Sequence, residues 1–312
     1  MKIGLIGFGS IGERHYKNLG RYSKDIAVFT KRKDLVLPNI FGNWKSFAAK
    51  APFDAVFIAN ETYKHLLTIK KCVGLKPKAI FVEKPLSHNT KGLKQTAKLL
   101  KQKKISLWVG YCLRFYEPLL RIKKIIRSKK LGKIYYLRAF AGGDLKVWRK
   151  RDYRRIYSAK KKQGGGAMLD LVHDINYPAW LLSDVLIPKA SLAKKISSLE
   201  INTEDFAENI LISKKGVVVS VHQDYLNVPG GRSLEIAGDK GTLYWDSTDN
   251  VLTIAACQGI FKKKIAVDRN DMYKKELKFF FHQMKTRKFF TNIDEAIEDM
   301  LNVEYLKKMA RI

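Results

Sequence analysis

The sequence is poor in the features that stabilise small secreted proteins or anchor a chain in a bilayer. It contains three cysteines, Cys72, Cys112 and Cys257, whose spacing matches neither a disulfide framework nor a metal-binding motif. No apolar run approaches the roughly 20 residues that a membrane-spanning helix needs. The first residues also lack the charged start and long apolar stretch of a signal peptide. These absences predict a cytoplasmic protein with no membrane partner and no metal site.

Acidic residues are scarce as well. The chain has 60 lysines and arginines against 29 acidic residues, a formal net charge of +31. A balance this basic is typical of nucleic-acid-binding proteins, but the cations are spread along the chain and no nucleic-acid-binding motif accompanies them. We therefore expect no nucleic-acid partner. The stretch 144–163 is the most basic, and a loop there could draw an anionic substrate to a site, although an ordinary solvated loop fits equally well.

Two domains are expected for a chain of 312 residues, because single hydrophobic cores seldom grow beyond about 250–300 residues. In the first part, short apolar segments alternate with helical ones. The expected strands are 2–6, 25–29, 54–58, 79–82 and 105–109, and the expected helices are 11–19, 63–73 and 90–101. This alternation predicts a parallel, doubly wound sheet of the Rossmann type in a domain spanning 1–115.

The pattern changes after residue 115. A helix at 119–128 and a strand at 134–140 are followed by a helix at 166–182, and two further helices end the chain at 271–285 and 293–309. Between them lie strand-like segments at 206–212, 217–223, 233–237, 242–245 and 251–255. Consecutive strands joined by short turns predict an antiparallel sheet in a second α/β domain, 116–312, whose last helix could pack back on the first domain.

A glycine-rich loop follows the first expected strand and opens the first helix. Its residues, all predicted to bind the cofactor, are Gly7, Phe8, Gly9, Ser10, Ile11 and Gly12. In the G-x-G-x-x-G pattern the first glycine allows a tight turn, the second lets the backbone approach a pyrophosphate, and the third lets helix and strand pack closely. The loop therefore predicts a dinucleotide cofactor, with a ligand-free glycine turn as the alternative.

The end of the second strand indicates which dinucleotide is bound. An acidic residue there would bond the ribose 2′-hydroxyl of NAD. This chain has Thr30, Lys31, Arg32 and Lys33 instead, a hydroxyl and three cations that suit a 2′-phosphate. We predict NADP as the cofactor, with NAD possible. A solvated basic loop is the alternative interpretation of the three cations.

Two further motifs carry a family resemblance. Glu83-Lys84-Pro85 follows the strand 79–82 at its carboxyl end, and Gly164-Gly165-Gly166 precedes Asp170. With the glycine loop, they make the whole chain resemble the glucose–fructose oxidoreductase / inositol dehydrogenase / MocA (Gfo/Idh/MocA) family. The resemblance implies a Rossmann domain and a second domain with an open, mostly antiparallel sheet. It also implies a homodimer or homotetramer, because that sheet face often forms the subunit contact.

The resemblance implies roles for individual residues. Lys84 would lie beside the nicotinamide and the reacting hydroxyl, His173 would be the general acid/base, and Asp170 would assist it or bind substrate. Further cofactor contacts are implied for Asn60, Glu61, His65 and Glu83. Substrate contacts are implied for Tyr111, Arg114, Arg154, Tyr157, Asp170 and His173.

The chain departs from the commonest family pattern. Asp170 and His173 are three residues apart, whereas many members space them by four, and Asn176 stands where an aspartate is common. Together with Tyr157 upstream, this arrangement resembles a subgroup found in bacterial gene clusters for surface polysaccharides and sialic-acid-like sugars. Such a subgroup implies a sugar or nucleotide-sugar substrate.

The chemistry of these residues suits hydride transfer at a carbinol carbon. Histidine has a pKa near working pH and can exchange the hydroxyl proton, while a lysine ammonium stabilises negative charge on oxygen. The two roles could also be exchanged, because the pKa of a lysine shifts readily on burial. We predict an NAD(P)-dependent dehydrogenase or ketoreductase acting on a sugar or nucleotide sugar in surface-polysaccharide metabolism.

Two other functions remain open, a nicotinamide-assisted epimerase or glycosidase and a non-catalytic NAD(P)-sensing protein. The remaining histidines show no pattern of partners in the sequence. His15, His88, His222 and His282 are therefore expected to be structural or at the surface.

Overall fold

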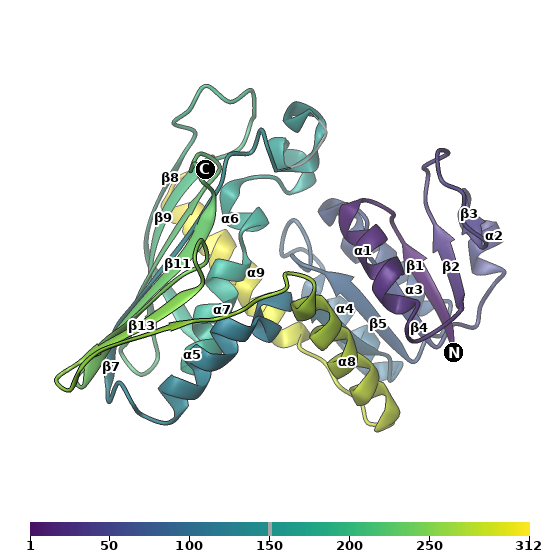
Figure 1. Ribbon diagram of the computed structural model, residues 1–312. Coiled ribbons are helices and arrows are strands. Elements are labelled where there is room, and N and C mark those ends of the chain that lie inside the picture. Colours follow the sequence, from purple (N-terminus) through teal and green to yellow (C-terminus); the bar gives the residue numbers. More distant parts are fainter. Residues whose placement is uncertain (149–151) are drawn as a thin grey trace. The chain divides into compact units, whose positions relative to one another are not determined.

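The computed structural model describes residues 1–148 and 152–312 and forms two compact units (Figure 1). The first unit comprises 1–111 and 273–300, and the second comprises 112–272 and 301–312. The chain thus returns to the first unit near its carboxyl end. Three of the cations in the basic stretch, Arg149, Lys150 and Arg151, lie outside the described residues.

The first unit is built on a six-stranded parallel sheet with the order β3-β2-β1-β4-β5-β6. Its strands are β1 (Lys2–Ile6), β2 (Asp25–Phe29), β3 (Ile40–Phe41), β4 (Ala55–Ile58), β5 (Ala79–Glu83) and β6 (Ser106–Gly110). The chain direction across the sheet reverses between β1 and β4, and in such sheets ligands bind outside the carboxyl ends of the strands at this point. In register, Ile6 pairs with Ile58 and Ile58 with Val82, so β1, β4 and β5 end at one edge.

Helices cover both faces of this sheet, and every residue of β4, β5 and β6 is buried. The helices are α1 (Ser10–Leu19), α2 (Trp44–Ala48), α3 (His65–Val73), α4 (Leu93–Gln102) and most of α8 (Asp271–Lys285). Phe280 and Phe281 of α8 pack on Phe57 of β4, with ring centroids 5.3 and 6.0 Å apart. A segment near the end of the sequence therefore completes the core of the first unit.

The second unit is built on an eight-stranded sheet with the order β14-β13-β12-β11-β7-β10-β9-β8. Its strands are β7 (Ile134–Gly142), β8 (Leu186–Lys194), β9 (Phe206–Ser213), β10 (Val218–Asp224), β11 (Gly231–Gly238), β12 (Gly241–Asp246), β13 (Val251–Ala256) and β14 (Gly259–Lys264). Neighbours are antiparallel except β7 and β10, which are parallel. The predicted fold class is confirmed.

Helices cover one face of this sheet and leave the other face open (Figure 1). They are α5 (Glu117–Arg127), α6 (Ala167–Asp170), α7 (His173–Leu182) and the second half of α9 (Ile293–Met309). Burial alternates along β9 and β10, as expected for strands with one face in the core. The face not covered by helices is called the open face below.

The elements of the second unit differ from the expected ones in three places. The helix expected at 166–182 is interrupted at Leu171 and Val172, which separate α6 from α7. Strand β8 was missed because it contains Pro188, which an edge strand tolerates at the irregularity between Pro188 and Ala190. Strand β14 was missed because it is exposed along its whole length and ends in three lysines, so no apolar alternation marks it.

Among the described residues, none of the helices combines the length and the apolar character that crossing a bilayer requires.

Candidate active site

The glycine loop has the geometry that a dinucleotide requires. Gly7 has φ +94°, and a Cβ there would lie 2.5 Å from the backbone nitrogen of Asn60. A Cβ on Gly12 would lie 2.3 Å from the carbonyl oxygen of Gly7. A Cβ on Gly9, by contrast, would meet nothing within 4 Å, and no side chain caps the N-terminus of α1. This open cradle at a helix N-terminus fits a pyrophosphate group.

The segment after β2 is tied to this loop by Arg32. Its guanidinium donates to the carbonyl oxygen of Phe8 at 3.1 Å and to the Asp34 carboxylate at 3.0 and 2.5 Å. Thr30 is buried, and its hydroxyl oxygen accepts the backbone N–H of Arg32 at 3.2 Å. Lys31 is exposed. The ion pair between Arg32 and Asp34 was not predicted, although an acidic residue two positions after an arginine indicates that such a pair can form.

The residues that follow β4 come from the same edge of the sheet. The side-chain amide of Asn60 donates to the Thr68 hydroxyl at 2.9 Å, and its Oδ1 is buried without a hydrogen-bond partner. That oxygen fits a donor from a bound dinucleotide, such as a ribose hydroxyl. Glu61 is exposed and pairs with Lys64 at 2.8 Å.

His65 links this edge to the segment after β5. Its ring nitrogens contact the carbonyl oxygens of Pro85 at 2.8 Å and Asn60 at 3.0 Å. Burial lowers its pKa, although these two contacts oppose that shift. His65, predicted to bind cofactor, is thus seen to hold two backbone segments together.

The Glu83-Lys84-Pro85 motif is anchored through its glutamate. The Glu83 carboxylate contacts Nε2 of His15 at 2.6 Å, and both residues are buried. His15 was expected to be structural or at the surface, and it is buried with a partner 68 residues away in the sequence, a distance at which local spacing gives no signal. Lys84 follows directly after β5 and is half-buried. Tyr111 is buried just after β6.

In the second unit, two tyrosine hydroxyls hold the carboxylate of Asp170. Tyr157 donates to Oδ1 at 2.6 Å and Tyr225 donates to Oδ2 at 2.9 Å. Asp170 and Tyr225 are buried. Tyr225 was missed because it lies 55 residues after Asp170, with no motif around it.

His173 begins α7 and is buried beside Cys112, whose sulfur lies 3.8 Å from its Nε2. Arg114 donates to the side-chain oxygen of Asn176, one turn further along α7, at 2.9 Å. Asn176, which departs from the common family pattern, thus accepts a hydrogen bond from Arg114, a residue predicted to contact the substrate.

The described part of the basic stretch combines buried apolar side chains with exposed cations. Leu145 and Ile156 lie in a core cluster with Tyr225, and Ser158 is fully buried. Arg154 forms ion pairs with Asp152 at 2.9 Å and with Glu200 at 3.2 Å. Within residues 144–148 and 152–163, some side chains are therefore packed, while Lys146, Arg155 and Lys161 remain exposed.

Comparison with known proteins covers both units. Residues 1–111 match the family model for oxidoreductases with an NAD-binding Rossmann fold, and residues 119–244 match the Gfo/Idh/MocA C-terminal domain. The chain belongs to the Gfo/Idh/MocA oxidoreductase family. The predicted membership and the predicted class, an NAD(P)-dependent dehydrogenase, are confirmed.

Relatives of this Gfo/Idh/MocA protein share about a quarter of its residues. Myo-inositol 2-dehydrogenase of Thermotoga maritima is 24% identical over 306 residues, which cover 92% of this chain and 89% of the relative. The inositol 2-dehydrogenase/D-chiro-inositol 3-dehydrogenase of Shouchella clausii is 25% identical, with coverage of 78% and 71%. The WlbA dehydrogenase of Bordetella pertussis, solved with NADH and UDP-GlcNAcA, superposes with a TM-score of 0.81 at 18% identity and coverage of 100% and 96%. The last likeness concerns the fold alone.

Proposed function

We propose that this Gfo/Idh/MocA dehydrogenase transfers hydride between a nicotinamide cofactor and a carbinol or carbonyl carbon of a sugar-type substrate. The observation that carries this proposal is the shared edge of the parallel sheet. Ile6, Ile58 and Val82 lie side by side in register. The glycine loop, Asn60 and Lys84 therefore follow neighbouring strand ends, where a dinucleotide binds in this fold.

Each residue has a definite task in this mechanism. Bound nicotinamide supplies the hydride acceptor or donor. His173 takes the hydroxyl proton during oxidation and returns it during reduction. The Lys84 ammonium stabilises negative charge on the substrate oxygen. Asp170 is fixed by two hydroxyl donors and orients the substrate or the acid/base group.

The test is turnover measured at 340 nm with the full chain. We expect absorbance changes with NAD(P)⁺ and members of a panel of myo-inositol, UDP-linked hexuronic acids and N-acetylneuraminic acid derivatives. Lys84→Ala and His173→Gln should each lower kcat about 10²- to 10⁴-fold. Product formed without a net absorbance change would instead indicate the epimerase or glycosidase class. Tight NADPH binding with no turnover on the panel would indicate a sensing protein.

For the cofactor, we propose a preference for NADP(H). The proposal is supported by Arg32, whose guanidinium is held by its bond to the glycine loop, since an arginine near this strand end can accommodate a 2′-phosphate. Asp34 neutralises part of its charge, so the preference should be moderate. KM should be lower for NADPH than for NADH, and Arg32→Ala should raise the NADPH value alone. A lower KM for NADH would contradict this proposal.

For the substrate, we propose a polyol or nucleotide sugar of bacterial surface-polysaccharide metabolism. The inositol dehydrogenases among the relatives support a polyol, and the WlbA dehydrogenase, solved with UDP-GlcNAcA, supports a nucleotide sugar. The cations of the basic stretch would favour an anionic substrate.

We also propose that the protein is a homodimer or homotetramer assembled through the open face. Apolar side chains on that face are markedly exposed, among them Ile187, Ile210, Val218 and Tyr244 at 36–46%. A hollow of about 530 Å³ lies between Arg138, His222 and Lys262 on the same face. Exposed apolar patches of this kind mark protein–protein contacts.

A further inference from the structure

The end of β10 presents two polar residues to the covered side of its sheet. Successive residues of a strand point to opposite faces, and along β10 Val219, Val221 and Gln223 are fully buried. Tyr225 follows in the same alternation and is also fully buried. Both Gln223 and Tyr225 contact the short segment that carries Asp170 and leads into His173.

Gln223 is bonded to the break between α6 and α7. Its side-chain amide donates to the carbonyl oxygen of Leu171 at 2.7 Å and to that of Met168 at 3.4 Å. Leu171 immediately follows α6, and His173 begins α7 two residues later. The bond therefore holds the backbone where the helix is interrupted.

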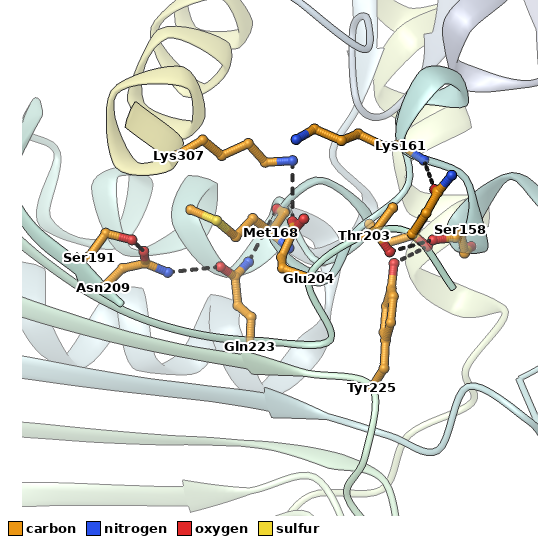
Figure 2. A network of polar contacts seen from close by, with 12 residues as sticks. Ser158, Lys161, Met168, Ser191, Thr203, Glu204, Asn209, Gln223, Tyr225 and Lys307 are labelled. Carbon is orange, nitrogen blue, oxygen red and sulfur yellow. Dashed lines mark hydrogen bonds and ion pairs between the residues drawn. The ribbon is translucent and has the colours of Figure 1, made fainter. Parts of the chain in front are cut away.

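Hydrogen bonds from side chains on the neighbouring strands hold Gln223 in place (Figure 2). Its Oε1 accepts from the Asn209 amide at 3.2 Å, and the Ser191 hydroxyl donates to Asn209 Oδ1 at 2.8 Å. These residues come from β10, β9 and β8, three neighbouring strands. Because the interior excludes water, an apolar residue at position 223 would fill the volume but leave the carbonyl of Leu171 without this donor.

Tyr225 acts on the carboxylate itself. Burial raises its pKa, and the nearby Asp170 and Glu204 carboxylates raise it further, so the hydroxyl stays protonated and donates. It holds Oδ2 of Asp170 while Tyr157 holds Oδ1. With both oxygens engaged, the carboxylate has one fixed orientation.

We propose that Gln223 and Tyr225 are positioning residues for the acid/base pair of the reaction. Gln223 fixes the backbone at the helix break between Asp170 and His173, while Tyr225 fixes the carboxylate. The inference rests on the proposed function, in which these two groups serve the reaction.

The test compares Gln223→Met and Tyr225→Phe with Tyr136→Phe in the full chain. Tyr136 lies on β7, and its hydroxyl bonds Glu235 at 2.5 Å, so the control removes the same kind of contact elsewhere in the sheet. With myo-inositol and NADP⁺ as probes, kcat should fall about 10- to 100-fold in the first two variants, because small misplacements of reacting groups have effects of this size. KM for NADP⁺ should change by less than about twofold, and the control should match the wild type.

A second measurement needs no substrate. The histidine side-chain NMR signal of His173, identified by its loss in His173→Gln, should shift in Gln223→Met and Tyr225→Phe and stay in place in Tyr136→Phe. If Gln223→Met does not fold, Asn209→Ser keeps Gln223 but removes its support, and it should shift the same signal less.

Two results would overturn the inference. One is a His173 signal and kcat that match the wild type in both β10 variants. The other is a loss of kcat on Tyr225→Phe that is equally large in an Asp170→Asn background, since that loss could not act through the carboxylate. Full turnover in His173→Gln would contradict the proposed function instead, and the NMR comparison would still decide the positioning role.

Discussion

At position 166 both the backbone conformation and the neighbouring side chain favour glycine. Its backbone has φ +108° and ψ 147°, a region that residues with a Cβ avoid. A Cβ there would lie 2.2 Å from Oε1 of Glu204, whose carboxylate accepts the backbone N–H of Met168 in α6. The last glycine of the triple-glycine motif therefore makes room for a buried carboxylate at the start of α6.

Gly166→Ala should lower the free energy of unfolding by about 3 to 5 kcal/mol, since backbone strain and overpacking add. The matched control is Gly216→Ala. Gly216 has φ +87°, but a Cβ there would meet nothing within 4 Å, so only strain of about 1 to 2 kcal/mol is expected. Urea unfolding measures both values, and equal losses would contradict the role of Glu204.

His222 is a second residue whose role depends on partners from other parts of the sequence. Its ring contacts Glu208 at 2.5 Å and Asp224 at 2.7 Å on the open face and stacks on Phe140. It was expected to be structural or at the surface, and these contacts agree with a structural role on the open face. Burial alone would lower its pKa, but the hydrogen bonds to Asp224 and Glu208 outweigh burial and raise it.

This raised pKa predicts a pH-dependent stability. The contribution of His222 is fully present below the unfolded pKa of about 6.5 and is lost as pH rises through the higher folded pKa. The difference in free energy of unfolding between the wild type and His222→Gln should therefore be largest near and below about pH 6.5 and shrink as the pH rises above that value. Denaturant titrations across this range measure it, and a difference that grows with pH would contradict the prediction.

Sequence motifs predicted the main residues of the candidate site better than the residues that hold them in place. The glycine loop and Lys84 were predicted because their chemistry is encoded in adjacent residues at strand ends. Gln223, Tyr225 and Glu204 were missed because the fold of the second unit brings them to α6 and the residue after it from 36 to 55 residues away, a distance at which local spacing carries no signal.

Among the elements, α9 makes a specific contact through its last turns. Lys307 pairs with Glu204 at 3.2 Å, where the glutamate side chain is only 4% exposed (Figure 2). The next residue, Lys308, pairs with Glu304 on the same helix, and that lysine side chain is 68% exposed. Two neighbouring lysines on one helix therefore hold a buried and an exposed carboxylate.

Lys307→Met should destabilise the protein by about 3 kcal/mol, because it leaves a buried carboxylate without its cation. Lys308→Met should have an effect below about 1 kcal/mol. In a Glu204→Gln background the Lys307→Met effect should largely disappear. Thermal or urea unfolding of the single and double variants measures this coupling. Similar effects of the two lysine variants would contradict the role of Lys307 as the partner of the buried carboxylate.

Element prediction succeeded where apolar periodicity was undisturbed. The bounds expected for β1, β2, α8 and α9 agree with the structure. The break between α6 and α7 was not predictable, because tertiary bonds from Gln223 cause it and no proline or glycine marks it in the sequence.

At the scale of the whole molecule, assembly through the open face is testable. Val218→Glu places a charge on a 41% exposed apolar position of that face, so it should convert a dimer or tetramer into a monomer. Leu67→Glu, at a 59% exposed position of α3, is the matched control and should leave assembly unchanged. Light scattering after size exclusion reads the mass, and a monomeric wild type would refute the proposal.

The pleat of β10 also limits how this enzyme can be engineered. His222 and Asp224 point to the open face, and their covalent neighbours Gln223 and Tyr225 hold the segment that carries Asp170 and leads into His173. Under the proposed positioning role, substitutions in β10 that alter assembly would also change turnover. Strands β13 and β14, which contribute nothing to these contacts within the described residues, offer positions where the two properties can be changed separately.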